Sequence, residues 1–230
     1  MNSLILKALK GEIIVSCQAE KDDPFNKPEY IALFAKAAQM GGAKCVRSEG
    51  IDNILAIKRI VDLPIIGLVK DTYEDGFVKI TGSFKDVEKL VKINCDIIAI
   101  DGTFRVRDGL TGPDFIYQIK QKNNCLVLAD ISTVEEAIAS VEAGADCVAT
   151  TLSGYTPETQ NKNLHPDFEL IKILSKKVRV PIFAEGRIKT PMEAKKAIEM
   201  GAYSIVIGSA ITRPRLITSW FVTSLNSHQK

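Results

Sequence analysis

Two glycine-bearing segments near the C-terminus have the residue types and the spacing of a phosphate-binding site. Gly186 follows an apolar run that ends at Glu185, and Gly208 follows the next apolar run, with one helical pattern between them. Glycine lets the backbone approach phosphate oxygens closely, and N–H groups at the start of the following helix donate hydrogen bonds. One such glycine is typical of a tight loop, but the pair is typical of the phosphate site after strands 7 and 8 of a (β/α)8 barrel. The pair predicts that the chain binds a small phosphorylated metabolite.

Lys70 ends the otherwise apolar segment PIIGLVK, residues 64–70. If this segment is a barrel strand, the ammonium lies at the barrel mouth, where burial and nearby cations such as Arg47 lower its pKa. A neutral amine can take a proton or attack a carbonyl. The simpler alternatives are a lysine that extends into solvent and one that pairs with phosphate. We favour a catalytic role.

Glu185 and Arg213 flank the glycine pair. Glu185 directly precedes the first glycine, so its carboxylate is expected near a substrate whose phosphate is already fixed, where it can orient a sugar hydroxyl or exchange a proton. Its alternative role is an ion pair with Arg187 or another cation at the barrel mouth. Arg213 can reach the phosphate, or it is a surface residue that precedes Pro214.

Short apolar runs alternate with amphipathic helical patterns along the chain. Eight runs are strand candidates: Ile13–Cys17, Lys44–Arg47, Ile65–Val69, Ile97–Asp101, Leu126–Asp130, Cys147–Thr150, Ile182–Glu185 and Ser204–Gly208. Eight β-α units predict an α/β fold, a closed (β/α)8 TIM barrel in which residues 1–230 form one domain. A doubly wound open sheet is the alternative, because periodicity does not show closure. Its usual GxGxxG dinucleotide fingerprint is absent after the first strand.

The polar residues that end these runs are the candidates for chemistry, because reactive side chains of a barrel project from the C-terminal ends of its strands. In order they are Gln18, Arg47, Lys70, Asp101, Asp130, Thr150 with Thr151, Glu185 with Arg187, and Ser209. For Asp101, Asp130 and the threonines, a loop charge or a helix cap is an equally good interpretation. Asp130 need not be the cap, because Ser132 or Thr133 can cap the next helix.

One helix-to-strand joint occurs three times, as AKAAQMGGAKCV (35–46), AIASVEAGADCV (137–148) and AKKAIEMGAYSIV (194–206). Each runs from an alanine-rich helix through a glycine at the helix C-cap, where a left-handed residue is favoured. The repeat is a structural signal. An additional strand-like piece, Phe77–Thr81, precedes a helix that starts near Ser83, and we expect it to elaborate the third βα loop on the active-site face.

Composition argues against several partners. Thirty basic residues against 28 acidic ones give a net charge of +2, too small to predict binding to nucleic acid or to an anionic membrane. We expect neither a signal peptide nor a membrane span. Five cysteines without a CxxC pair predict buried free thiols in the reducing cytoplasm rather than disulfides or zinc ligands.

The chain has only two histidines, His165 and His228. Two are too few for a His-rich metal centre, so we expect no metal, which argues against metal-dependent pentulose-phosphate epimerases and zinc hydrolases. His165 is expected to be a loop residue rather than a ligand. The sequence also lacks the nucleophile elbow of hydrolases, the P-loop and the kinase motifs.

With these positions on the page, the chain resembles the N-acylglucosamine-6-phosphate 2-epimerases, also called N-acetylmannosamine-6-phosphate 2-epimerases. The matching stretches are IIVSCQA (13–19), VRSEG (46–50), DNILAIK (52–58), DLPIIGLVK (62–70), IIAIDGTFRVR (97–107), LADISTVEEA (128–137), TTLSGYT (150–156), IFAEGRIKTP (182–191) and IVIGSAITRP (205–214). They follow one another over nearly the whole chain. One departure is Gly102, where many relatives have alanine, and it leaves the shape of the fourth loop open.

The resemblance implies a cofactor-free enzyme that interconverts N-acetylmannosamine 6-phosphate and N-acetylglucosamine 6-phosphate in sialic acid or amino-sugar breakdown. It assigns proton transfer to Lys70 with Glu185 as its partner, and substrate binding to Gln18, Arg47 and Asp130. The phosphate end would consist of Gly186, Arg187, Gly208, Ser209 and Arg213. The resemblance also implies a homodimer.

The substrate suggests a mechanism, because C2 inverts without redox chemistry only if its C–H bond breaks, and that hydrogen is acidic only beside an open-chain aldehyde. Lys70 would remove the C2 proton after ring opening, and the second proton would come from Glu185, from Lys70 again or from a substrate hydroxyl. Two alternatives stay open at this point. One is a Schiff-base aldolase acting on a phosphorylated sugar, and the other is a non-catalytic sugar-phosphate-binding regulator.

Overall fold

Eight parallel strands close into a barrel whose order around the sheet is β1-β10-β9-β8-β7-β6-β3-β2. The computed structural model describes residues 2–20, 22–160 and 165–226, and His228 therefore lies outside the described residues. The barrel strands are β1 (Ile13–Cys17), β2 (Cys45–Glu49), β3 (Ile65–Leu68), β6 (Ile97–Asp101), β7 (Leu126–Asp130), β8 (Cys147–Ala149), β9 (Ile182–Glu185) and β10 (Ser204–Ile207). The predicted (β/α)8 barrel is confirmed, and the open-sheet alternative is wrong because β1 pairs with both β2 and β10.

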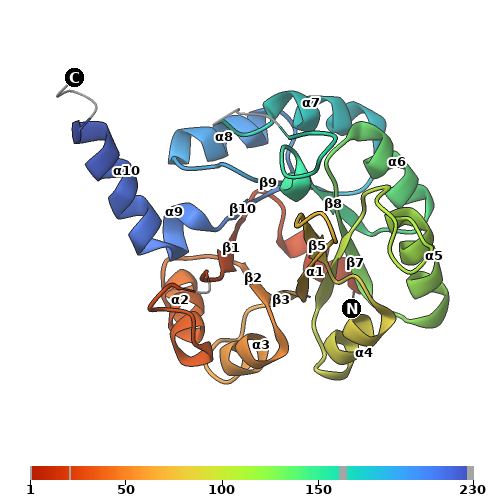
Figure 1. The fold of residues 1–230 in the computed structure, drawn as a ribbon, viewed down its shortest axis with the longest axis horizontal. Helices are drawn as coiled ribbons and strands as arrows, with labels where there is room; N and C mark the ends of the chain where they lie inside the picture. The colour runs from red at the N-terminus through yellow and green to blue at the C-terminus, as the bar shows by residue number, and fades with distance from the viewer. Residues whose placement is uncertain (1, 21, 161–164, 227–230) are drawn as a thin grey trace.

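Helices surround the barrel, as Figure 1 shows. The helices of the described residues are α1 (Asn2–Ala8), α2 (Pro28–Met40), α3 (Ile51–Lys58), α4 (Phe84–Lys92), α5 (Gly112–Lys122), α6 (Val134–Glu142), α7 (Phe168–Lys177), α8 (Pro191–Glu199), α9 (Ser209–Thr212) and α10 (Pro214–Asn226), with a 3-10 turn η1 at Thr150–Leu152. Helices α2 to α8 form the ring. Ser83 caps α4, as its position predicted, and Thr133 caps α6 through a capping box with Glu136. Asp130 is therefore free of a capping role.

Alternation along the strands divides the buried apolar residues into two layers. Ile14, Ile66, Leu128 and Phe183 belong to one cluster of buried residues, which also contains Leu9 from the turn after α1. A larger cluster combines the other strand faces with the helices, for example Val127 with Ile116 of α5. This arrangement of a filled barrel inside a ring of helices is the usual core of the fold, and it leaves the strand ends free to carry polar groups.

The repeated glycine joints have the backbone conformation that the sequence predicted. Gly42, Gly144 and Gly201 follow α2, α6 and α8 with φ of 96°, 101° and 105°. These values lie in the left-handed region that glycine adopts without steric cost. Each glycine thus turns the chain from an outer helix back into the barrel.

A two-stranded hairpin elaborates the third βα loop, where the sequence predicted an extra strand. Strand β4 (Lys70–Thr72) pairs antiparallel with β5 (Val78–Ile80), and Lys70 lies opposite Ile80. Lys70 therefore begins the hairpin instead of ending β3, which corrects the expectation that it closes a barrel strand. The cause is the base of the hairpin, where the Thr81 N–H donates to the Val69 carbonyl at 2.7 Å and draws the chain away from the barrel.

The hairpin is fixed to the loop after β6. The Tyr73 hydroxyl donates to Asp101 at 3.1 Å, and the Arg105 guanidinium lies 3.7 Å from the centre of the Tyr73 ring. Asp101 also pairs with Arg107 at 3.1 Å. Of the two interpretations of Asp101, its contacts support the structural one.

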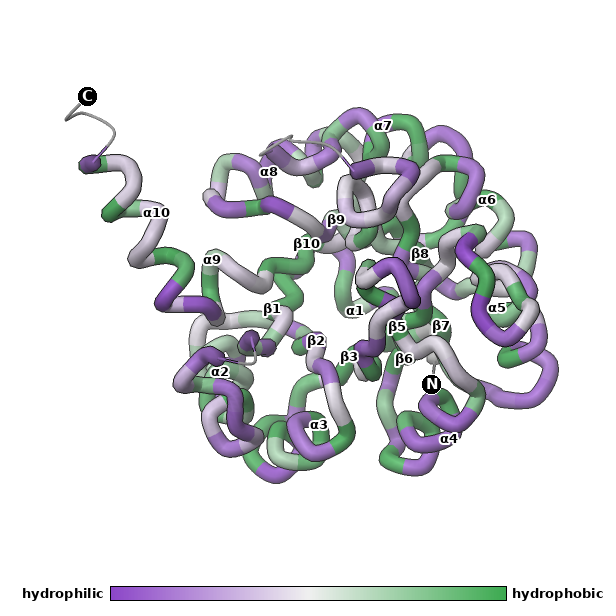
Figure 2. Tube along the Cα trace, viewed as in Figure 1, coloured by the Kyte–Doolittle hydropathy of each residue, from purple (hydrophilic) through white to green (hydrophobic). Residues whose placement is uncertain are grey.

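The last helix, α10, extends away from the ring of helices (Figure 1) and has no buried residue. Its sequence is nevertheless rich in apolar residues, which Figure 2 shows along the projecting segment. Phe221 and Leu225 are 70% and 72% exposed. Within the described part of the chain, every helix is too short or too polar to cross a membrane.

The close contact of Gly112 with the loop after β6 generates a stability prediction. A Cβ at Gly112 would lie 2.6 Å from the carbonyl oxygens of Asp101 and Thr103, and backbone atoms cannot turn aside as a side chain can. We expect Gly112→Ala to lower the free energy of unfolding by about 1–3 kcal/mol, the usual cost of overpacking. Urea unfolding followed by circular dichroism measures this.

Gly41→Ala is the matched control, because Gly41 ends α2 with φ of −77° and a Cβ there would meet no atom closer than 3.4 Å. We expect it to change stability by less than about 0.5 kcal/mol. Equal stability of the two variants would show that the Gly112 contact is not tight.

Candidate active site

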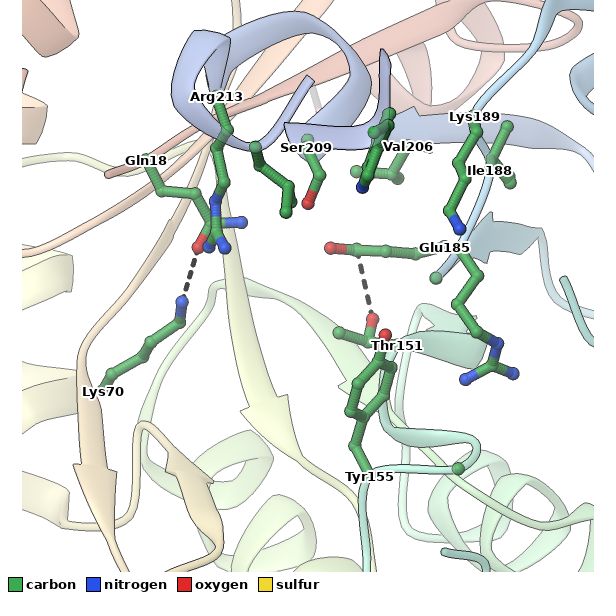
Figure 3. Close-up of a pocket in the computed structure, with 16 residues that line it drawn as sticks. Gln18, Lys70, Thr151, Tyr155, Glu185, Ile188, Lys189, Val206, Ser209 and Arg213 are labelled. Atoms are coloured by element: carbon green, nitrogen blue, oxygen red, sulfur yellow. Dashed lines mark hydrogen bonds between the residues drawn. The ribbon is translucent and has the colours of Figure 1, made fainter. Parts of the chain in front are cut away.

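A cavity of about 470 Å³ opens at the C-terminal ends of the barrel strands. Figure 3 shows its lining. It brings together most of the residues that the sequence singled out: Gln18, Lys70, Glu185, Gly186, Arg187, Gly208, Ser209 and Arg213. A volume of this size accepts a small metabolite.

Arg47 and Asp130 do not line the cavity but lie buried beside Glu185. Arg47 is 2% exposed and Asp130 is fully buried. The two Arg47 terminal nitrogens donate to the two Asp130 oxygens at 2.8 and 2.7 Å, and Arg47 Nη1 lies 3.0 Å from Glu185 Oε2. Three strands, β2, β7 and β9, thus contribute one guanidinium and two carboxyl groups to a single buried cluster. Such a cluster persists only when each charge has partners.

The turn η1 completes this cluster with two threonine hydroxyls. Thr151 Oγ1 lies 2.5 Å from Asp130 Oδ1 and 3.1 Å from Glu185 Oε2. Thr150 Oγ1 donates to the Glu185 carbonyl at 2.8 Å and accepts from the Glu185 N–H at 3.1 Å. Thr150 therefore fixes the backbone of Glu185, and Thr151 contacts its carboxyl group.

Glu185 has a carboxyl group whose pKa is close to neutrality. Burial raises this pKa to about 6, the Arg47 charge opposes the shift, and the Asp130 charge adds to it. The ion pair that the sequence left as an alternative is present, with Arg47 as the cation. A carboxyl group with such a pKa can donate or accept a proton near pH 6.

Lys70 reaches the cavity from the hairpin. Its ammonium donates to Gln18 Oε1 at 2.5 Å and lies 3.4 Å from Glu49 Oε2. Burial of the ammonium lowers the pKa of Lys70, the Glu49 charge opposes this shift, and Arg47 and Arg213 add to it. The direction is the one that the sequence led us to expect. Figure 3 shows Lys70 and Glu185 on opposite sides of the cavity.

The two glycine segments need glycine for different reasons, the first because of its backbone conformation and the second because of the space around it. Gly186 has φ of 110°, and Arg187 follows with φ of 60°. Gly208 has a negative φ, but a Cβ there would lie 3.3 Å from Gln18 Nε2 and from Ser16 Cβ. Glycine at 208 thus keeps space for Gln18 at the cavity wall.

The two arginines predicted at the phosphate already have partners. Arg187 donates to the carbonyls of His165 and Ser153, both at 2.7 Å. Arg213 Nη1 contacts Glu20 Oε1 at 2.5 Å, while its buried Nε has no hydrogen-bond partner among the described residues. Both side chains line the cavity and give that part of its wall a positive charge. Their hydrogen bonds meanwhile connect them to residues of neighbouring loops.

Reasoning from strand ends missed several lining residues, among them Tyr155, Lys189 and Trp220. Tyr155 comes from the loop after η1, Lys189 from the loop before α8, and Trp220 from α10. Lys189 Nζ lies 5.2 Å from the centre of the Trp220 ring. The signal available in the sequence was that Trp220 is the only tryptophan of the chain. His165, expected to be a loop residue, is 76% exposed in its side chain.

The raised pKa of Glu185 predicts how stability depends on pH. Between about pH 4.5, the usual value, and pH 6 the folded protein keeps a proton on Glu185 that the unfolded chain has released. Because the folded state binds more protons, this group lowers the free energy of unfolding as pH rises through that window, by about 2 kcal/mol in total. Glu185→Gln removes the effect. Urea unfolding at pH 4.5–7 should show the variant gaining stability relative to the original protein, whereas parallel curves would contradict the raised pKa.

Comparison with known proteins identifies the family of the chain. A family model described as "Putative N-acetylmannosamine-6-phosphate epimerase" matches residues 31–227. The chain is 44% identical over 221 residues to a "Putative N-acetylmannosamine-6-phosphate 2-epimerase" of Clostridioides difficile (strain 630), covering 96% of this chain and 99% of the relative. A relative with the same description from Caldanaerobacter subterraneus subsp. tengcongensis is 47% identical over 230 residues, which cover 98% and 95% of the two chains.

Solved structures give the same result. The N-acetylmannosamine-6-phosphate 2-epimerase from Clostridium perfringens superimposes with a TM-score of 0.89 and 45% identity, covering 95% of each chain. A thiamine phosphate pyrophosphorylase from Pyrococcus furiosus, with a TM-score of 0.59 and 15% identity, shares the fold alone. Because the family model and the relatives match nearly the whole chain, this protein belongs to the N-acetylmannosamine-6-phosphate epimerase family, whose members are isomerases.

Proposed function

We propose that residues 1–230 act as one barrel domain that interconverts N-acetylmannosamine 6-phosphate and N-acetylglucosamine 6-phosphate. One observation carries this proposal: a lysine amine with a lowered pKa and a carboxyl group with a raised pKa face one cavity from opposite sides. A base on one face of a carbon centre and an acid on the other face can invert it. The names of the relatives supply the substrate.

The reaction begins on the open-chain sugar, because only an aldehyde at C1 makes the C2 hydrogen acidic. Neutral Lys70 takes that proton and becomes an ammonium, and the electron pair of the C–H bond forms an enolate with C1. Protonated Glu185 returns a proton to the opposite face of C2 and becomes a carboxylate. The reverse reaction uses the same two groups with their protonation exchanged. Positioned acid and base groups contribute about 10²- to 10⁴-fold each.

The phosphate is proposed to lie against Gly186, Arg187, Gly208, Ser209 and Arg213. Support comes from the shared cavity lining and from the buried Nε of Arg213, for which the described part of the chain offers no hydrogen-bond partner. Lys189 adds a further positive charge to this wall. Gln18 contacts Lys70 and is proposed to bind the sugar. Arg47 and Asp130 are proposed to act on the substrate indirectly, because Arg47 contacts the Glu185 carboxyl group and is itself held by Asp130.

The proposed reaction balances without a metal or cofactor, because protons alone move. We place it in the breakdown of sialic acid or amino sugars, and we propose a cytoplasmic location. Support for the location comes from the five cysteines, all of which are free thiols. Burial raises the pKa of Cys17 and Cys95 to about 12, so these thiols stay protonated at neutral pH. Nucleic acids and membranes are not expected partners at a net charge of +2.

A homodimer is proposed because α10 has no buried residue against its own barrel. A helix of this length is marginal in water by itself, and its apolar residues are exposed. A second copy of the chain offers the same helix by two-fold symmetry. We therefore propose that α10 of one copy packs against the other copy.

Replacing the proposed base tests the function. We expect Lys70→Ala to lower kcat by at least about 10²-fold while phosphate binding persists, because the amine is lost and the phosphate wall remains. Proton NMR of N-acetylmannosamine 6-phosphate in D₂O measures conversion and deuterium at C2. Lys36→Ala is the control, because it removes the same charge from an exposed position on α2. This variant should convert the substrate at the normal rate.

Substantial turnover by Lys70→Ala would refute the assignment of the base. Covalent labelling of Lys70 on borohydride treatment with substrate would support a Schiff-base aldolase instead. Failure of the original protein to convert the sugar, with binding retained, would favour a regulator.

Light scattering after size exclusion tests the dimer. We expect the protein to elute with twice the 25.2 kDa mass of one chain. Phe221→Glu combined with Leu225→Glu places charges on the apolar face of α10 and should yield monomers. Thr223→Glu, on the opposite face of the same helix, is the control and should remain dimeric. A monomeric original protein at micromolar concentration would overturn the proposal.

A further inference from the structure

Thr151 occupies a position that the proposed reaction does not yet use, between two buried carboxyl groups. Its Oγ1 lies 2.5 Å from Asp130 Oδ1 and 3.1 Å from Glu185 Oε2. The turn η1 holds it there, because the neighbouring Thr150 bonds the Glu185 backbone and Leu152 N–H donates to the Ile131 carbonyl at 3.2 Å. The hydroxyl is therefore fixed relative to both carboxyl groups.

A threonine hydroxyl has one hydrogen to donate and lone pairs that accept. It cannot donate to both carboxyl groups at once. The shorter contact is with Asp130, and hydrogen bonds to an ionised acceptor are the shorter and stronger kind. With the hydrogen directed at Asp130, the Thr151 lone pairs face Glu185, and that contact is favourable only if Glu185 itself carries a proton.

The charges around Glu185 favour the same arrangement. Arg47 from β2 is the only cation within bonding distance of both carboxyl groups among the described residues, and it donates two hydrogen bonds to Asp130. Asp130 from β7 therefore has three donors and is the better-stabilised anion. Lys70 from the hairpin also faces Glu185 and favours its ionised form. One cation beside two carboxyl groups leaves room for one proton, and Glu185 is the group that holds it.

We propose that Thr151 is a positioning residue that holds the Glu185 carboxyl group in the orientation needed for proton transfer to the substrate. This inference rests on the proposed role of Glu185 as the acid. In the resting site the hydroxyl donates to Asp130 and accepts from the Glu185 carboxylic acid. A turn about the terminal torsion of Glu185, which is soft, presents the acid proton to C2. After transfer the Thr151 hydroxyl rotates and donates to the Glu185 carboxylate, so one group serves both protonation states.

The test separates the two proton transfers in D₂O. Lys70 alone exchanges the C2 hydrogen of the substrate without inversion, because its ammonium exchanges with solvent and returns deuterium to the same face. Inversion requires the acid on the other face. We expect Thr151→Val, which matches threonine in shape but lacks the hydroxyl, to lower inversion about tenfold relative to exchange, the effect expected from one net hydrogen bond. Thr151→Ser should restore the original ratio. Proton NMR measures both rates in one sample.

A role of Thr151 in folding alone would lower exchange and inversion together, and this result, like an unchanged ratio, would overturn the inference. If Thr151→Val does not fold, as judged by circular dichroism, Thr151→Ala compared with Thr151→Ser decides by the same ratio. Glu185→Gln distinguishes a failure of the proposed acid from a failure of the Thr151 inference. Loss of inversion in Glu185→Gln with a normal ratio in Thr151→Val defeats only the Thr151 inference, whereas normal inversion in Glu185→Gln defeats the proposed acid and the inference with it.

Discussion

One buried guanidinium between two carboxyl groups is the interaction on which the site depends. Arg47, Asp130 and Glu185 come from strands that are far apart in sequence, so their contacts brace the C-terminal end of the barrel across its width. Taking these groups out of water is costly, and the two-pronged pairing of Arg47 with Asp130 offsets much of that cost. The pairing is unequal, because Arg47 donates two hydrogen bonds to Asp130 and makes a single contact with Glu185. Glu185, the carboxyl group with the weaker contact, is the one whose pKa burial raises to about 6.

Most of the barrel was predictable, because its signals are local. Buried parallel strands read as short apolar runs, and the glycine of each helix-to-strand joint reports a left-handed residue that other residues adopt only with strain. The hairpin was half predicted. Val78–Ile80 has a strand-like pattern, but its partner begins with Lys70, Asp71 and Thr72, and these polar residues carry no apolar signal. Projection of α10 away from the ring has no local signal, since an amphipathic pattern does not say which surface covers it.

The site was predictable where it follows the barrel rule and not elsewhere. Strand ends led to Lys70 and Glu185, and both line the cavity. The same rule gave Asp101, whose carboxylate instead binds Tyr73 and Arg107. Asp101 and Asp130 thus end neighbouring strands with the same residue type but have different partners, and the residues that surround each strand end decide between the two uses. Trp220 reaches the cavity from a helix far beyond the strand ends, which depends on the path of the chain in space.

Placing Lys70 on the hairpin has a consequence for how the protein can change. A barrel strand moves only if the core around it is repacked. A substitution that shifts Glu185 therefore lowers the stability of the barrel. The hairpin meets the rest of the fold through Tyr73, Arg105 and the base at Thr81, and β5 is anchored by Ile80, which is buried in the same cluster as Ile14. Changes in the exposed strand β4 therefore shift one side of the cavity while the barrel keeps its stability. One side of the cavity, at Glu185, thus belongs to the barrel itself, whereas the other side, at Lys70, belongs to a loop element outside it.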